Sequence, residues 1–252
     1  MTATVHLVIP CFQESLRIAP FLRDLKAVFG TNCQTKIMLV EDGSGAAEQA
    51  RFLSVVESII RDCPLFTPSL LLPENLGKGG AVYAGWAQHD DADWLAFVDA
   101  DGSCSASETK RLIELAQSSS SLDAGKGSPP ALFASRVKML GRQVDRQFKR
   151  HLMGRIYATL VSELLHIPVY DSQCGLKLVP RAAFEKISNR LSIKGFAFDA
   201  DLLVNLLDAG QDVVEVPIDW HETPGGKIQL IRDSWRMFRD VLRIRGNRQP
   251  AQ

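Results

Sequence analysis

The sequence predicts a single α/β domain in which a mostly parallel central sheet is flanked by helices. Over residues 5–98, apolar runs of strand length alternate with segments of helical periodicity, an order typical of parallel sheets with right-handed crossovers. A polar or glycine-rich cluster follows each of the first four apolar runs. Because ligands bind outside the carboxyl ends of strands in such sheets, we expect these clusters to form one site.

The elements of this regular half can be placed from periodicity and turn residues. Strands are expected at 5–9, 36–40, 69–72 and 94–98, and helices at 14–29, 46–60 and 80–88. A loop at 117–130, rich in serine, glycine and proline, precedes a less regular half. That half is expected to contain strands at 132–135 and 212–220 and helices at 145–165, 198–210 and 228–245.

The composition excludes some classes of protein. Of the 252 residues, 46% are hydrophobic and 23% are charged, and the formal net charge of zero gives no support to nucleic-acid binding. The five cysteines include no Cys-x-x-Cys spacing, which favours a reducing compartment. The sequence begins without a signal-peptide pattern, and no apolar run approaches the roughly 18 residues of a membrane span. We therefore expect a cytoplasmic protein whose membrane contact, where there is one, is peripheral.

Two aspartates follow the apolar run at 94–98, in the sequence DADGS. A turn at Ala100 and Gly102 lets Asp99 and Asp101 converge, and carboxylate oxygens suit Mg²⁺ or Mn²⁺. A divalent ion held by two carboxylates usually takes phosphate oxygens as further ligands. The alternative is a simple turn that caps a helix beginning near Ser105.

The other clusters favour a phosphate ligand. NLGKGGA at 75–81 offers glycines for close backbone approach, the cation Lys78 and a helix N-terminus, which together make an anion site. EDGSG at 41–45 places a carboxylate and a glycine turn beside another helix start. Each signal is weak alone, since solvated helix starts explain both. Together they predict a nucleotide diphosphate lying across the strand ends with a metal on its phosphates.

These motifs, with PCFQE at 10–14, resemble the family 2 inverting glycosyltransferases of GT-A (Rossmann-like) fold. The later motifs resemble the dolichyl-phosphate glucosyltransferase and mannosyltransferase branch and lie closer to the glucosyl side; they are ASR at 134–136, DSQCGLK at 171–177, GFAFDADLL at 195–203, VVEVPIDW at 213–220 and GGK at 225–227. We expect a GT-A domain over residues 1–226, followed by a basic amphipathic helix and tail over 227–252.

The resemblance implies roles for individual residues. Lys78 lies near the nucleotide-sugar donor, Asp99 and Asp101 form the metal-binding pair with Asp101 the closer ligand, and Arg136 and Arg150 hold the lipid phosphate of the acceptor. The pocket for the base and ribose is formed by Pro10, Phe12, Glu14 and Asp42.

The implied reaction is an inverting transfer of a hexose from a nucleotide sugar to a polyprenyl or dolichyl phosphate. UDP-glucose is favoured over GDP-mannose, and Mg²⁺ or Mn²⁺ with Lys78 stabilises the leaving diphosphate. A lipid phosphate is mostly ionised at neutral pH and needs little general-base help, whereas a sugar hydroxyl needs a base. The candidates for that base are Asp171 first and Asp199 second; the alternative for Asp199 is a helix cap.

Two basic segments bear on the acceptor. Residues 136–155 hold seven Lys or Arg and one acid, which indicates a phosphate-binding patch or a solvated helix face. In the last helix an apolar stripe lies beside a row of arginines, as in helices that lie on anionic lipid. The alternative is a stripe that packs on the domain. The stripe consists of Ile231, Trp235, Phe238 and Leu242, and the row of Arg232, Arg236, Arg239 and Arg243.

Three other functions stay open at this level. The same fold could use a soluble sugar or polysaccharide acceptor, or could serve as a non-catalytic nucleotide-binding scaffold. Intact Asp99, Asp101, Lys78 and Arg136 argue against the scaffold. Nucleic-acid binding through the 136–155 patch is disfavoured because Phe148 is its one aromatic residue available for base stacking.

Overall fold

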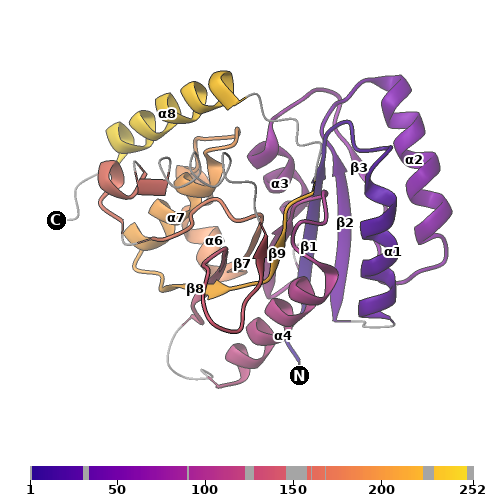
Figure 1. Ribbon diagram of the computed structural model, residues 1–252, viewed down its shortest axis with the longest axis horizontal. Coiled ribbons are helices and arrows are strands. Elements are labelled where there is room, and N and C mark those ends of the chain that lie inside the picture. Colours follow the sequence, from indigo (N-terminus) through magenta and orange to yellow (C-terminus); the bar gives the residue numbers. More distant parts are fainter. Residues whose placement is uncertain are drawn as a thin grey trace.

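A seven-stranded sheet lies between two layers of helices in the computed structural model (Figure 1). The structure describes residues 2–30, 34–89, 91–122, 128–145, 158–159, 161–167, 169–223 and 230–248. The sheet strands are β1 (Val5–Cys11), β2 (Thr35–Glu41), β3 (Leu70–Leu71), β4 (Trp94–Val98), β5 (Ala131–Ser135), β7 (Leu176–Pro180) and β8 (Val213–Pro217), in the order β3-β2-β1-β4-β7-β5-β8. A small second sheet pairs β6 (Val144–Asp145) with β9 (Trp220–His221).

Helices join and cover these strands. They are α1 (Ile18–Phe29), α2 (Ala46–Ile60), α3 (Lys78–Trp86), α4 (Ala106–Leu122), α6 (Arg181–Ile187), the 3₁₀ turn η1 (Ser188–Arg190), α7 (Phe198–Asp208) and α8 (Leu230–Asn247). None of the helices in the described ranges is long and apolar enough to cross a membrane.

The predicted mostly parallel sheet is confirmed, with one exception. Strand β7 runs antiparallel to both its neighbours, β4 and β5, while the other pairs of this sheet are parallel. The sequence did not predict this strand, because Lys177 interrupts its short apolar run. Its register pairs Val98 with Leu176, which brings the segment before β7 against the residues that follow β4.

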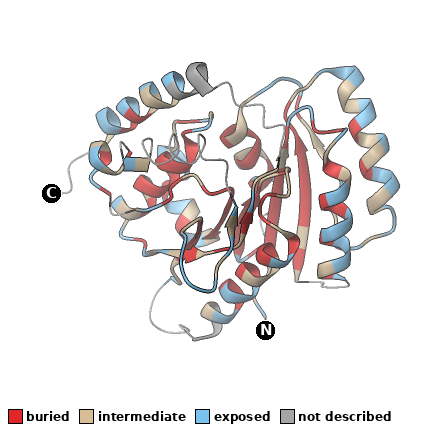
Figure 2. Cartoon of the chain, viewed as in Figure 1, coloured by how far each residue is buried: buried red, intermediate tan, exposed pale blue. Residues whose placement is uncertain are grey.

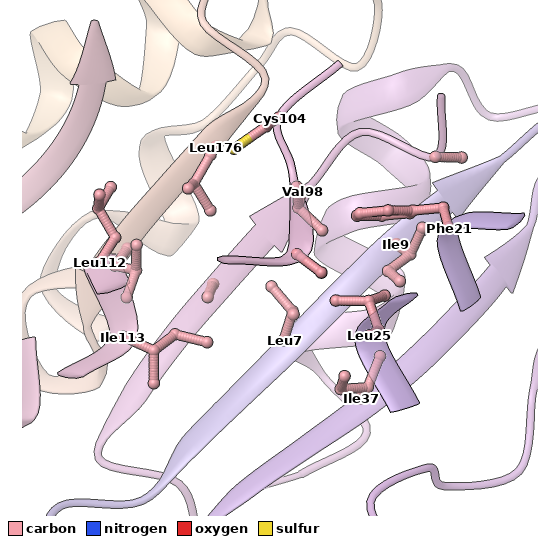
Figure 3. Packing of buried hydrophobic residues seen from close by; sticks show 14 of the residues in the cluster. Leu7, Ile9, Phe21, Leu25, Ile37, Val98, Cys104, Leu112, Ile113 and Leu176 are labelled. Atoms are coloured by element: carbon pink, nitrogen blue, oxygen red, sulfur yellow. The ribbon is translucent and has the colours of Figure 1, made fainter. Parts of the chain in front are cut away.

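Alternating side chains build a core on each face of the sheet. Along β4, Trp94 and Val98 join the cluster under α1, α2 and α4, while Leu95 and Phe97 join the one under α3, α6 and α7. Figure 3 shows the first cluster, where Phe21 and Leu25 of one helix and Leu112 and Ile113 of another approach apolar strand residues. Strands apolar on both faces are expected for a sheet covered on both sides.

Several predicted boundaries were wrong. Helix α1 begins at Ile18 rather than at Glu14, because residues 14–17 form a turn closed by the Arg17 amide on the Glu14 carbonyl. Helix α4 extends into the predicted 117–130 loop; its Ser118 hydroxyl donates to the Glu114 carbonyl, one turn back. Asp145 ends β6 instead of opening a helix. Most of the predicted 145–165 helix lies outside the described residues.

Helix α8 packs on the domain through a face other than the predicted stripe. Val241 and Ile244 are buried in the core cluster that includes α7, and Arg248 pairs with Asp208 at 2.6 Å. Trp235 and Leu242 are exposed and Phe238 is half-buried, so the alternative in which the whole stripe packs inward is wrong. Figure 2 shows exposed residues along this helix. The predicted boundary at 226/227 lies outside the described residues and stays a prediction.

Candidate active site

Three of the predicted clusters meet beyond the carboxyl ends of β1, β2 and β3. The Gln13 amide, after β1, donates to the Ser44 hydroxyl, after β2, at 2.8 Å. The Asp42 carboxylate accepts from the Leu76 amide at 2.7 Å and from the Gly77 amide at 3.0 Å. Asp42 thus fixes the loop that leads into α3. Burial raises the pKa of Asp42, and these two amides act in the opposite direction by favouring the charged form.

Glycines in these loops are required by close backbone approach. Gly43 has φ +62°, and a Cβ there would lie 2.1 Å from the Glu74 carbonyl carbon. Gly77 has φ +83°, and its Cβ would lie 2.7 Å from the Lys194 carbonyl oxygen. Both positions therefore exclude larger residues. Helix α3 starts immediately after Gly77 and directs the amides of Lys78 and Gly79 toward this edge, while the Gly80 amide donates to the Lys194 carbonyl at 3.1 Å.

Lys78 and Asp99 form an ion pair in the middle of this edge. Nζ of Lys78 lies 2.7 Å from Oδ1 of Asp99, and 5.4 Å and 5.7 Å from the ring centroids of Phe97 and Phe198. Burial disfavours the ammonium, but Asp99, Asp199 and Asp101 outweigh it and the pKa of Lys78 is raised. Lys78 is therefore fully charged at neutral pH.

Asp99 and Asp101 fit a divalent cation shared with phosphate oxygens. The Ser103 amide donates to Oδ1 of Asp101 at 2.9 Å, which orients that carboxylate. Burial first, and then the charge of Asp99, raise the pKa of Asp101, so the two carboxylates repel each other in the absence of a cation. The described residues hold no cluster of three metal-binding side chains. An ion here would take its remaining ligands from substrate and water, as Mg²⁺ commonly does.

Arg136 and Asp171 form a bidentate pair on the other side of β7. Nε and Nη2 of Arg136 each lie 2.7 Å from an Asp171 oxygen, and the guanidinium carbon lies 5.0 Å from the ring centroid of Trp220. The amides of Tyr170 and Asp171 donate to Glu215 at 2.8 Å each, so β8 holds the segment that carries Asp171. The pair uses two of the three guanidinium nitrogens.

The pairing weakens Asp171 as a candidate base. Burial acts to raise its pKa, but the Arg136 guanidinium more than offsets this and holds the pKa of Asp171 well below its usual range. A carboxylate with a lowered pKa and both oxygens on one guanidinium is a poor proton acceptor. The role of Asp171 as a general base stays a prediction, and the geometry assigns the residue to positioning Arg136.

A second buried ion pair was not predicted. Nζ of Lys177, on β7, lies 3.0 Å from Oδ1 of Asp199 in the first turn of α7, and donates to the Cys174 carbonyl at 2.7 Å. The side chains of Lys177 and Asp199 are 0% and 3% exposed. Asp199 makes no helix cap, since the residue preceding α7 is Ala197 and no side chain caps that helix. The signal in the sequence was a lysine inside an apolar strand, which needs a buried partner.

The two sides adjoin across β7. The Asp99 amide donates to the Gly175 carbonyl at 2.9 Å, and a Cβ on Gly175 would lie 2.2 Å from Oδ2 of Asp99. The charge of Asp99 also contributes to the raised pKa of Arg136, after the opposing effect of burial and the larger contribution of Asp171. Six predicted residues are therefore in one charged cluster: Lys78, Asp99, Asp101, Arg136, Asp171 and Asp199.

The predicted base and ribose pocket is less defined. Pro10 is half-buried in β1, and Phe12 is 38% exposed in the loop that follows. The Glu14 carboxylate accepts from Arg17 at 3.0 Å and 3.1 Å. Their roles in binding a nucleotide stay predictions. Arg150 and the motif at 225–227 lie outside the described residues.

The family model that matches this chain is that of glycosyl transferase family 2, over residues 6–187. The dolichyl-phosphate beta-glucosyltransferase of Saccharomyces cerevisiae is 31% identical over 249 residues, which cover 96% of this chain and 74% of the yeast protein. The protein of the same name from Dictyostelium discoideum is 27% identical over 250 residues, which cover 96% of this chain and 73% of its own.

Solved structures share the fold. Glucosyl-3-phosphoglycerate synthase from Mycobacterium tuberculosis, in complex with Mn²⁺, UDP and phosphoglyceric acid, superposes with a TM-score of 0.66 at 15% identity, covering 96% of this chain and 77% of the other. The mannosyltransferase PcManGT from Pyrobaculum calidifontis, in complex with GDP-Man and Mn²⁺, gives a TM-score of 0.61 at 15% identity, covering 95% and 61%. The predicted GT-A architecture is confirmed. From the family match and the coverage of these relatives, this chain belongs to glycosyl transferase family 2.

Proposed function

We propose that this enzyme transfers a hexose, glucose from UDP-glucose in preference to mannose from GDP-mannose, onto a polyprenyl or dolichyl phosphate with inversion at the anomeric carbon. The observation that carries this proposal is that both candidate bases for a sugar hydroxyl are already paired with cations. Asp171 is paired with Arg136, and Asp199 is paired with the buried Lys177. A phosphate acceptor is compatible with that arrangement because it is already ionised at neutral pH.

On the donor side, charge develops on the departing nucleotide diphosphate. Lys78 and the first amides of α3 lie where they would stabilise that charge. We further propose that Asp99 and Asp101 hold Mg²⁺ or Mn²⁺, which supplies positive charge to the diphosphate when bound. The Lys78–Asp99 pair then has to loosen, since both groups are required by the diphosphate and its cation.

On the acceptor side, Arg136 positions the phosphate. Asp171 binds Nε and Nη2, so Nη1 is the guanidinium nitrogen outside the pair. The guanidinium is 13% exposed and lies against Trp220, which restricts its direction. A fixed cation can orient an anionic nucleophile without any proton transfer. The main contribution of Arg136 to the reaction is therefore to position the acceptor phosphate. Arg150 stays a proposed second contact.

The proposed acceptor is a lipid, so the enzyme has to reach a membrane surface. The yeast and Dictyostelium relatives carry dolichyl phosphate in their names, which supports the lipid acceptor. We place the reaction at the cytoplasmic face with the enzyme as a peripheral protein. The four cysteines within the described ranges are free thiols, in keeping with a reducing compartment.

The test compares transfer from labelled UDP-glucose and GDP-mannose to a short-chain polyprenyl phosphate, with Mn²⁺ and with EDTA. We expect metal-dependent glucosyl transfer. The Arg136→Lys variant keeps a charge but loses the bidentate geometry, so it should lower acceptor kcat/KM by about 100-fold with donor affinity within about twofold. Efficient transfer to a soluble glucoside and none to the phosphate would overturn the lipid acceptor.

A further inference from the structure

The outward face of α8 is apolar in its centre. Trp235 is 69% exposed and Leu242 is 44% exposed, and the Phe238 ring lies 5.9 Å from the Trp235 ring between centroids. Spacings of three and four residues place these side chains on one stripe, in which Trp235 and Leu242 face outward and the half-buried Phe238 borders Val241, which is buried against the domain with Ile244. Helix α8 lies along the edge of the molecule, so nothing in the described chain covers this stripe (Figure 1).

The charge around the stripe has one sign. Arg236, Arg239 and Arg243 follow the same spacing beside it, and all three are exposed. The one acidic residue between 235 and 248 is Asp240. Its Oδ2 lies 3.7 Å from the position that a Cβ on Gly195 would occupy, so this carboxylate faces the domain and leaves the outward face positive.

We propose that the outward face of α8, comprising Trp235, Phe238, Leu242 and the arginines beside them, docks on an anionic lipid bilayer. This docking surface rests on the proposed function for its biological purpose. It extends that function by assigning the surface through which the enzyme reaches a lipid acceptor. Aromatic and leucine side chains enter the headgroup region while arginine stems snorkel to the lipid phosphates. The arginines beside the stripe complement the phosphates of an anionic lipid surface.

The chain carries its own probe of this contact. Of its four tryptophans, Trp86, Trp94 and Trp220 are buried, so Trp235 is the one whose emission responds to the surroundings of α8. The full chain is titrated with vesicles of phosphatidylcholine alone or with about 30 mol% phosphatidylserine. We expect a blue shift and co-flotation with the anionic vesicles, weakened in about 0.5 M salt.

Matched variants separate the two contributions. Trp235→Ser with Leu242→Ser should weaken vesicle binding at least about tenfold, and Arg239→Gln with Arg243→Gln about 25-fold, since each basic residue near an anionic surface contributes about fivefold. Leu115→Ser, at a 42% exposed leucine on α4, is the control and should change nothing. Co-flotation is the readout for the variant that lacks Trp235.

Absence of any shift or co-flotation with anionic vesicles would overturn the inference. So would a Trp235 shift that follows protein concentration without lipid and accompanies a doubled mass, since a second copy would then cover the stripe. Transfer to a water-soluble short-chain polyprenyl phosphate is measured without vesicles and tests the proposed function alone. Vesicle binding without transfer would support the lipid-docking surface and overturn the proposed function. Transfer without vesicle binding would support the proposed function and overturn the lipid-docking surface.

Discussion

Charged side chains at the carboxyl edge of the sheet are arranged differently on the two sides of β7. On the donor side, Asp99 is 26% exposed and Asp101 half-buried, and the two carboxylates repel each other with Lys78 as the nearest cation. On the acceptor side, Arg136 and Asp171 are 13% and 9% exposed and already paired. The donor side is thus short of positive charge until substrate and cation arrive, whereas the acceptor side is neutralised in advance.

This contrast has an energetic consequence. A carboxylate pair under mutual repulsion destabilises the fold slightly and is retained for binding. A buried, hydrogen-bonded ion pair contributes little net stability, but removing one partner leaves an uncompensated charge. Substitutions on the donor side should therefore affect activity more than folding, and substitutions in the buried pairs beyond β7 should affect folding strongly.

The largest expected effect is on turnover in Asp101→Ala. Loss of a carboxylate that holds the cation on the diphosphate should lower kcat by about 1000-fold or more. The free energy of unfolding should stay the same or rise, because repulsion with Asp99 is relieved. Steady-state kinetics and urea unfolding measure the two quantities, with Asp145→Ala, at an exposed site on β6, as the control. Ordinary turnover in D101A would remove Asp101 from the metal site.

The next effect is on stability in Lys177→Met. The substitution leaves Asp199 charged and buried without its partner, so the free energy of unfolding should fall by about 3 kcal/mol. In the double variant with Asp199→Leu the charge is absent, and we expect at least half of the loss to be recovered. Urea unfolding at neutral pH measures both. A double variant no more stable than K177M would show that the effect does not come from the unpaired charge.

A smaller effect is expected on the pH dependence of stability, through His6 in β1. Burial of His6 in β1 lowers its pKa to about 4, from 6.5, and its Nε2 donates to the Gly85 carbonyl at 3.1 Å. The unfolded chain binds a proton at this residue near pH 6.5 while the folded chain does not, so stability is lost as pH falls below that value. The loss assigned to His6 is about 2 kcal/mol between pH 7.5 and 5.

The measurement for His6 is urea unfolding over that pH range. His6→Gln should remove this part of the pH dependence, while His221→Gln, at an exposed site, should keep it. The Arg136–Asp171 pair should still be charged at pH 5, because the guanidinium holds the pKa of Asp171 well below its usual range, so acid should weaken β1 and its neighbours before this pair. An unchanged pH profile in H6Q would contradict the assignment.

The smallest effect tests the junction of the two sides. Gly175→Ala places a Cβ 2.2 Å from Oδ2 of Asp99 and should displace that carboxylate. We expect affinity for Mn²⁺ with UDP to fall about tenfold, measured by calorimetry. Gly246→Ala, where a Cβ meets nothing within 4 Å, is the control and should bind normally. Full affinity in G175A would mean that the loop moves aside and that the junction is not rigid.

Residues in the sequence determined most of the donor side. Strand-to-helix alternation and a polar cluster after each strand sufficed, because parallel strands end at one edge and local periodicity reports their direction. Helix α2 and strand β4 have the predicted bounds. Asp99, Asp101 and Lys78 were found in this way, and family resemblance supplied their roles.

Only the tertiary structure decided the acceptor side and the orientation of α8. Arg136 and Asp171 are 35 residues apart, and Lys177 meets Asp199 across two elements, so no local pattern encodes either pair. Both depend on β7 entering antiparallel between β4 and β5. In α8 two apolar stripes compete, and periodicity alone cannot choose between them. Val241 and Ile244 are buried and Trp235 is exposed, because the face of α8 that packs beside α7 is set by the fit of side chains rather than by hydrophobicity alone.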